Sequence, residues 1–214
     1  MTRTLLCFGD SNTHGTIALD RLGAFKRHDR NVRWPGVAAS RLGADWHVIE
    51  EGHPGRTTVH DDPIEGPHRN GLTVLPSLLE SHQPIDLVAL MLGTNDLKPR
   101  FSVTPTDISL SVERLIKVIQ ASKSGPDQTA PEILVVAPVP IIETAVLKDI
   151  FAGGAAKSEE LSVLYQLVAD RMDCGFIDAG KHAKVDPVDG VHLDEDAHLA
   201  IGSAISKKIE SEYA

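Results

Sequence analysis

Residues 86–92 read DLVALML and are followed directly by the polar block Gly93-Thr94-Asn95-Asp96. Six consecutive apolar side chains in so short a run indicate a strand that is covered on both faces, as in a parallel sheet. The glycine and polar residues behind the run are a turn signal that ends the strand. The stretch therefore predicts an α/β fold whose central strand carries polar side chains at its carboxyl end.

The rest of the chain repeats this alternation of strands and helices. An alternating order within one domain predicts an open five-stranded parallel sheet with helices on both faces. We expect a single domain over residues 1–214, a length that buries a continuous core. Further strands are predicted at 5–8, 46–49, 133–137 and 175–178, and helices at 34–42, 72–79, 106–122, 158–172 and 194–212.

Four short blocks carry the chemistry, at residues 9–11 (GDS), 52–55 (GHPG), 93–96 (GTND) and 189–192 (DGVH). The first three follow predicted strands, and in open α/β sheets ligands bind beyond the carboxyl ends of the strands. Together the blocks supply a serine, a histidine, an acid and hydrogen-bond donors for a developing negative charge. That set of groups is what acyl transfer requires.

The predicted catalytic residues are Ser11 as nucleophile, His192 as general base and Asp189 as the acid that orients the histidine. A serine hydroxyl reacts at neutral pH only when an adjacent base takes its proton. A polar turn at Ser11 and a surface loop at His192 are the purely structural alternatives. Three other acids near His192 remain candidates for the orienting role: Asp186, Asp194 and Asp196.

An oxyanion hole is predicted from the backbone N–H groups of Ser11 and Gly55 and the side-chain amide of Asn95. A glycine at position 55 lets the backbone approach a substrate closely, because it has no Cβ. A simple turn at Gly55 and an Asx turn at Asn95 are the structural alternatives.

These blocks resemble those of the SGNH hydrolase superfamily, the GDSL-type esterases and lipases, whose four letters correspond here to Ser11, Gly55, Asn95 and His192. The resemblance implies a flavodoxin-like three-layer α/β/α sandwich that uses no cofactor. It also implies hydrolysis of short-chain acyl and aryl esters and, frequently, assembly into oligomers. Several stretches are similar to the arylesterase and acyltransferase branch: residues 33–36, 50–52, 56–58, 61–63, 69–71 and 91–96, with Lys98 following.

Three positions depart from that branch: Asn12 replaces the usual leucine, His14 an often aromatic residue, and Gly55 a non-glycine residue. A more polar pocket admits water to the acyl-enzyme, so we expect mainly hydrolysis with minor acyl transfer to alcohols. The alternatives are a carbohydrate O-acetylesterase, which the polar His14 and His53 would suit, and a non-catalytic binding protein of the same fold.

A second group of residues is predicted to contact the substrate, because these residues lie in or beside the segments that follow the strands. Lys98 and Arg100 have two interpretations: their charges favour an anionic substrate, or they are ordinary charged side chains exposed to solvent. The predicted substrate-binding residues are Asn12, His14, His53, Lys98, Phe101 and Ile142.

Composition and charge limit the partners, the compartment and the cofactors that we expect for this protein. The formal net charge of -9 argues against nucleic-acid and membrane partners. The sequence has no apolar run of transmembrane length and no signal-peptide pattern, so we expect a cytoplasmic protein with a small-molecule ester substrate. Its two cysteines are expected to be reduced, and its ten histidines have no metal-ligand spacing, so no metal is expected.

Overall fold

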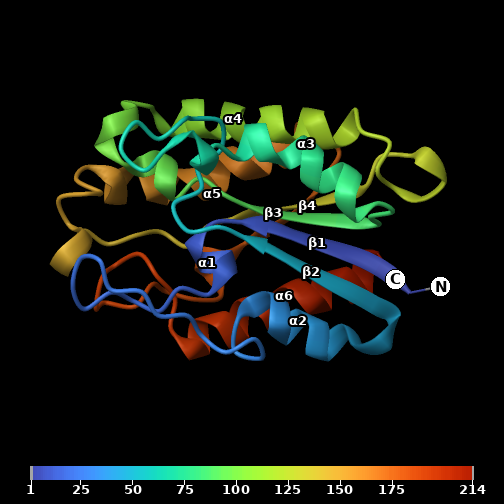
Figure 1. Ribbon diagram of the computed structural model, residues 1–214, viewed down its shortest axis with the longest axis horizontal. Helices are drawn as coiled ribbons and strands as arrows, with labels where there is room; N and C mark the ends of the chain where they lie inside the picture. The colour runs from blue at the N-terminus through green and yellow to red at the C-terminus, as the bar shows by residue number, and fades with distance from the viewer. Residues whose placement is uncertain (1, 214) are drawn as a thin grey trace.

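The computed structural model describes residues 2–213 and has a five-stranded sheet at its centre (Figure 1). Every pairing in this sheet is parallel, and the order across it is β2-β1-β3-β4-β5, which confirms the predicted sheet. The strands are β1 (Arg3–Gly9), β2 (Trp46–Gly52), β3 (Leu87–Met91), β4 (Glu132–Ala137) and β5 (Gly175–Asp178).

Helices cover both faces of the sheet and complete a three-layer α/β/α sandwich. In Figure 1, α3, α4 and α5 lie on one side of the strands, and α2 and α6 lie on the other. The α-helices are α1 (Ser11–His14), α2 (Trp34–Leu42), α3 (Gly71–His82), α4 (Pro105–Gln120), α5 (Gly154–Arg171) and α6 (Glu195–Glu212).

Alternate side chains of each strand enter two separate cores, because successive residues of a strand point to opposite faces. On β1, Leu6 and Phe8 pack with residues of α3, α4 and α5, whereas Leu5 and Cys7 pack with residues of α2 and α6. Every residue of β3 is at most 2% exposed. This two-sided burial explains the unbroken apolar run at 87–92.

The order of the strands places the ends of β1 and β3 side by side. From β1 the chain adds β2 on one side and then returns to add β3 on the other, which makes this the switch point of the sheet. Gly9 pairs with Met91, so the two strands end at the same level. The residues that follow them, Ser11 and Asn95, therefore meet at one edge of the sheet.

Helix boundaries agree with the predicted ones to within two residues, apart from the end of α3, which lies at His82 rather than at residue 79, and the start of α5. That helix begins at Gly154 rather than at residue 158, directly after Gly153, whose φ of 76° is left-handed. α2 spans the predicted range 34–42, where Pro35 occupies the first turn and Gly43 follows the last residue. Within residues 2–213 no helix combines the length and apolarity needed to cross a membrane.

A buried histidine pair makes the stability of the protein sensitive to acid. His198 is fully buried, lies edge-on to His28 with ring centres 5.2 Å apart, and accepts a hydrogen bond from Trp34 N–H at 3.3 Å. Burial, together with the charges of His28 and Arg33, lowers the pKa of His198 to about 3. In the unfolded chain a histidine has a pKa of about 6.5.

Below pH ~6.5 the unfolded chain therefore binds a proton at position 198 that the folded protein does not, and stability falls as the pH falls towards 3. Urea unfolding at neutral pH and at pH ~4.5 should show that His198→Gln removes up to ~3 kcal/mol of the acid-induced loss. The exposed His47→Gln is the control and should leave the loss unchanged. An equal loss in wild type and His198→Gln would contradict this assignment.

Candidate active site

The candidate nucleophile begins the short helix α1 directly after β1. The Asp10 carboxylate caps this helix by accepting a hydrogen bond from Asn12 N–H at 2.9 Å. Gly9 permits the tight turn, since a Cβ at this position would lie 2.0 Å from Thr13 Oγ1. Ser11 is thus held at the carboxyl edge of the sheet and is 6% exposed.

The loop between β5 and α6 brings a histidine and an acid to Ser11. His192 Nε2 lies 3.1 Å from Ser11 Oγ, and His192 Nδ1 lies 2.5 Å from Asp189 Oδ2. The loop turns at Gly190, whose φ is 78°. Asp189 Oδ1 accepts hydrogen bonds from Val191 N–H and His192 N–H, both at 2.9 Å. The three side chains therefore form one hydrogen-bonded line.

Asp189 is ionised in this setting. Burial alone would raise its pKa, but the hydrogen bond and charge of His192, with the backbone N–H groups of His192 and Leu19, lower the pKa to about 2. A carboxylate that accepts from Nδ1–H leaves the Nε2 lone pair facing the serine hydroxyl. The arrangement can therefore remove the Ser11 proton during nucleophilic attack.

Gly55 and Asn95 line the same cavity as Ser11 and His192. Gly55 has a φ of 77°, a left-handed conformation that favours glycine. Asn95 Nδ2 donates to the Arg56 carbonyl at 3.1 Å and lies 3.4 Å from Asp10 Oδ2. The loops after β1, β2 and β3 thus meet at one point beside Ser11.

Two buried carboxyl groups support these loops. Burial raises the pKa of Asp10 to about 6, and burial together with the charge of Asp10 raises that of Asp96 to about 7. Asp96 also accepts hydrogen bonds from Thr58 N–H at 3.0 and 3.1 Å. Asp96 therefore fixes the segment after β2 to the end of β3, and it does not line the cavity.

The cavity beside Ser11 and His192 has a volume of about 190 Å³, and its lining is partly apolar and partly polar. A larger hollow of about 930 Å³ lies elsewhere, next to Val139, His182 and Ala197, and contains none of the predicted catalytic groups. The smaller cavity is therefore the one where the chemistry is possible. Its apolar lining is Leu19, Ala24, Phe25, Pro54, Leu147, Ile150, Phe151 and Val191, and its polar side chains are Ser11, Thr16, Glu65, Asn95, Lys98 and His192.

Of the predicted substrate-binding residues, the structure places only Lys98 on this cavity. Ile142 lines the larger hollow. Phe101 ends a short 3-10 helix, stacks on His60 with ring centres 5.5 Å apart and does not line the cavity of Ser11. These two positions therefore lie outside the cavity wall.

The other three predicted contacts are not part of the cavity lining. Asn12 Nδ2 donates to the Val191 carbonyl at 3.1 Å and so joins the α1 turn to the loop of His192. The His14 ring contacts Phe25, which does line the cavity, with ring centres 5.8 Å apart. His53 is turned towards His68 at 5.8 Å.

Most of the cavity wall was not identified from the sequence. Phe25, Glu65 and Ile150 lie in irregular segments, and Leu147 ends a three-residue 3-10 helix, so none of them belongs to a segment with apolar periodicity. Their positions depend on contacts between distant residues, such as the hydrogen bond from Leu19 N–H to Asp189 Oδ2 at 2.7 Å. Within residues 2–213 no group of three His, Cys, Asp or Glu side chains is placed to hold a metal ion.

The model of the GDSL-like lipase/acylhydrolase family matches residues 7–200 of this chain. The chain belongs to that family. A search of curated protein sequences gives no significant match. This GDSL-like chain is also similar, throughout its length, to several solved structures of esterases.

The aryl esterase of M. smegmatis is 41% identical, with a TM-score of 0.93 over 98% of this GDSL-like chain and 99% of that protein. Est24, a carbohydrate acetylesterase from Sinorhizobium meliloti, gives the same identity, coverage and TM-score. A member of the lipolytic protein G-D-S-L family from Veillonella parvula is 15% identical with a TM-score of 0.64, and this likeness shows the fold alone.

Proposed function

We propose that this protein is a serine esterase that hydrolyses short-chain acyl and aryl esters through Ser11, His192 and Asp189. The observation that carries the proposal is the line from Ser11 Oγ to His192 Nε2 at 3.1 Å and from His192 Nδ1 to Asp189 Oδ2 at 2.5 Å. Membership of the GDSL-like family supports the same chemistry.

In the proposed reaction, Ser11 Oγ attacks the ester carbonyl while His192 Nε2 takes the hydroxyl proton. The tetrahedral oxyanion is stabilised by the N–H groups of Ser11 and Gly55 and by Asn95 Nδ2. His192 then gives the proton to the leaving alcohol, which departs and leaves an acyl-enzyme. Water, activated by the same histidine, attacks this ester and restores Ser11.

The size of the cavity supports a preference for short acyl groups. A volume of about 190 Å³ is below the several hundred Å³ common for ligand sites, and Leu147, Ile150 and Phe151 form its apolar side. Hydrolysis is proposed as the main outcome, with transfer to alcohols as a minor one. Glu65 and Lys98 in the wall support this balance, because a polar wall retains water near the acyl-enzyme.

Hydrolysis of p-nitrophenyl acetate, butyrate and octanoate tests the proposal. We expect kcat/KM to fall with chain length, by about a hundredfold or more from acetate to octanoate, because a cavity of about 190 Å³ is too small to enclose the longer chain. Addition of an excess of alcohol to the acetate assay should give mainly acetate and little of the transfer ester. Highest activity on octanoate, or mainly transfer product, would refute the corresponding part of the proposal.

A carbohydrate O-acetylesterase is the second candidate, favoured by the charged pair Glu65 and Lys98 in the cavity wall. Lys98 Nζ lies over the Phe151 ring, 5.8 Å from its centre, and charged side chains beside an aromatic surface suit a hydroxylated alcohol with an apolar face. Acetylated xylan and chitooligosaccharides, compared with phenyl acetate, separate the two candidates. A higher kcat/KM on the sugars would favour the second.

We also propose that the protein forms a homo-oligomer and is located in the cytoplasm. Val163 and Leu167, one turn apart on α5, are 67% and 54% exposed, which suits a contact between subunits. Cys7 and Cys174 are both free, as expected in a reducing compartment. Light scattering of the purified protein tests the assembly, and a monomer at all concentrations would contradict it.

A further inference from the structure

The Glu65 carboxylate lies directly against the candidate oxyanion hole. Its Oε2 would be only 2.7 Å from a Cβ at Gly55, so the carboxylate occupies the space that any larger residue at that position would need. The Glu65 side chain is 32% exposed and lines the cavity together with Ser11 and Asn95. A bound ester therefore faces this charge.

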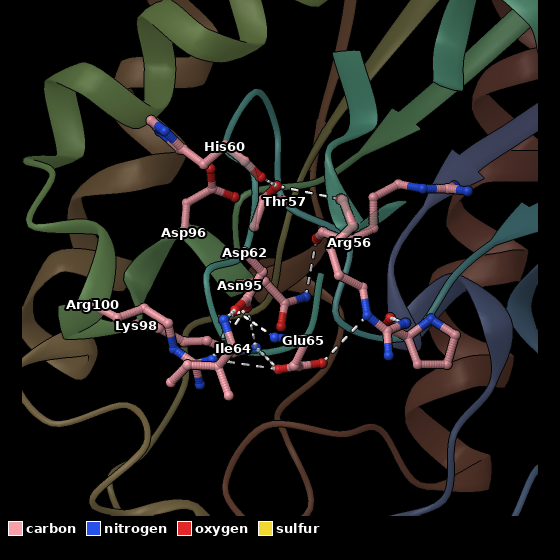
Figure 2. A network of polar contacts seen from close by, with 12 residues as sticks. Arg56, Thr57, His60, Asp62, Ile64, Glu65, Asn95, Asp96, Lys98 and Arg100 are labelled. Atoms are coloured by element: carbon pink, nitrogen blue, oxygen red, sulfur yellow. Dashed lines mark hydrogen bonds and ion pairs between the residues drawn. The ribbon is translucent and has the colours of Figure 1, made fainter. Parts of the chain in front are cut away.

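Three cations surround Glu65. Lys98 Nζ lies 2.8 Å from Oε1, Arg69 Nε lies 3.4 Å from Oε2, and Arg100 Nη1 lies 3.8 Å from Oε1. Figure 2 shows the Lys98 ammonium joined to the Glu65 carboxylate, with Arg100 beside them. The Lys98 side chain is only 5% exposed, so Lys98 is not a solvated surface charge.

Glu65 is the closer of two carboxylates to Lys98, because the second, Asp62, lies farther away and is bonded to Arg100. Asp62 Oδ1 lies 3.0 Å from Arg100 Nη1, whereas Asp62 Oδ2 is 3.9 Å from Lys98 Nζ. A buried ammonium without a close counter-ion attracts any anion that can reach it. Without the Glu65 charge, the cavity wall would present Lys98 as an anion site.

Glu65 is not required to shape the segment that carries it. The turn at 62–66 is held by Asp62 Oδ1, which accepts from Ile64 N–H at 2.8 Å and Glu65 N–H at 2.9 Å. The Gly66 N–H to Asp62 carbonyl bond, 2.9 Å long, closes the same turn. The contacts of the Glu65 carboxylate are with the cations around it, so a change there alters charge more than backbone structure.

We propose that Glu65 determines charge selectivity: its carboxylate neutralises Lys98 at the cavity wall, so that the site takes uncharged esters and rejects esters that carry a carboxylate. This inference rests on the proposed esterase function and adds a substrate class to it. An anionic substrate finds Lys98 already paired with Glu65, so its own carboxylate has no free ammonium to pair with beside the oxyanion hole. Removal of that charge lets the substrate carboxylate pair with Lys98 instead.

The test compares para-acetoxybenzoate with para-acetoxybenzamide, two acetates of similar shape that differ in charge. In Glu65→Gln the ratio of kcat/KM for the anion to that for the amide should rise about tenfold or more over wild type. Glu65→Asp retains the charge and is the matched control, in which the ratio should stay near the wild-type value. Adding Lys98→Gln to Glu65→Gln should abolish the gain, and high salt should weaken it.

An unchanged ratio in Glu65→Gln would overturn the inference, even if both activities fall together, because equal losses indicate a structural role. A ratio that rises equally in Glu65→Asp would also overturn it. If wild type hydrolyses neither acetate nor any p-nitrophenyl ester, the proposed function itself fails, and the two failures are therefore distinguishable.

Discussion

Ser11→Ala is expected to lower kcat for p-nitrophenyl acetate by about 10⁶-fold, to the residual rate that an oxyanion hole and substrate binding supply alone. The reason is that Ser11 Oγ is the atom 3.1 Å from His192 Nε2, and the methyl group of alanine cannot form an acyl-enzyme. The fold should be retained, because the Asp10 side chain caps α1 through Asn12 N–H and not through the serine.

Steady-state rates and fluorophosphonate labelling followed by mass spectrometry measure this effect. Wild type should take one label at Ser11, and Ser11→Ala none. Ser203→Ala on α6, which removes a hydroxyl bonded only to its own helix at Leu199, is the control and should label normally. Residual activity within a hundredfold of wild type, after contamination is excluded, would mean that another group is the nucleophile.

The sheet and its helices were predictable because their signals are local and mutually consistent. Residues 87–92 are apolar throughout, since both faces of β3 are covered, and residues 34–42 combine helical spacing with Gly43 at the end. The start of α5 differs because the sequence carries no local signal for it. The N-cap residue is Gly153, which has no capping side chain, and the cap is supplied by the distant Glu143, whose carboxylate accepts from Ala155 N–H at 3.0 Å.

The residues proposed for chemistry were predictable for a topological reason. Ser11, Gly55 and Asn95 each follow a strand, and parallel strands deliver their carboxyl ends to the same edge. The topology of the sheet does not predict in the same way which residues line the cavity. Lys98 is predictable because it follows the Gly93–Asp96 block closely, three residues after Asn95. Glu65 lies in an irregular segment, and its place beside Gly55 depends on how that segment folds back over the sheet.

The second large effect is expected for Asp189→Asn, which should lower kcat/KM by about 10⁴-fold. Asp189 Oδ2 accepts from two donors, His192 Nδ1 at 2.5 Å and Leu19 N–H at 2.7 Å, while Oδ1 accepts from two backbone N–H groups. An asparagine has a single acceptor oxygen, so it can accept from only one of these two pairs of donors. When its NH₂ group faces His192 Nδ1, that nitrogen must act as an acceptor. The histidine is then favoured in the tautomer whose Nε2 carries the proton, and Nε2 cannot receive the proton of Ser11.

A merely destabilising change would lower the amount of folded protein, so melting temperatures and activity per folded molecule are measured together. The control is Asp186→Asn, an acid of the same loop whose carboxylate accepts from Val188 N–H at 2.8 Å and does not contact His192. That variant should retain activity within about tenfold, because it leaves the Asp189–His192 bond intact. If Asp189→Asn were the mild variant and Asp186→Asn the severe one, Asp186 would be the acid that orients His192. The fourfold acceptor role of Asp189, which also positions Leu19 at the cavity wall, argues for the opposite result.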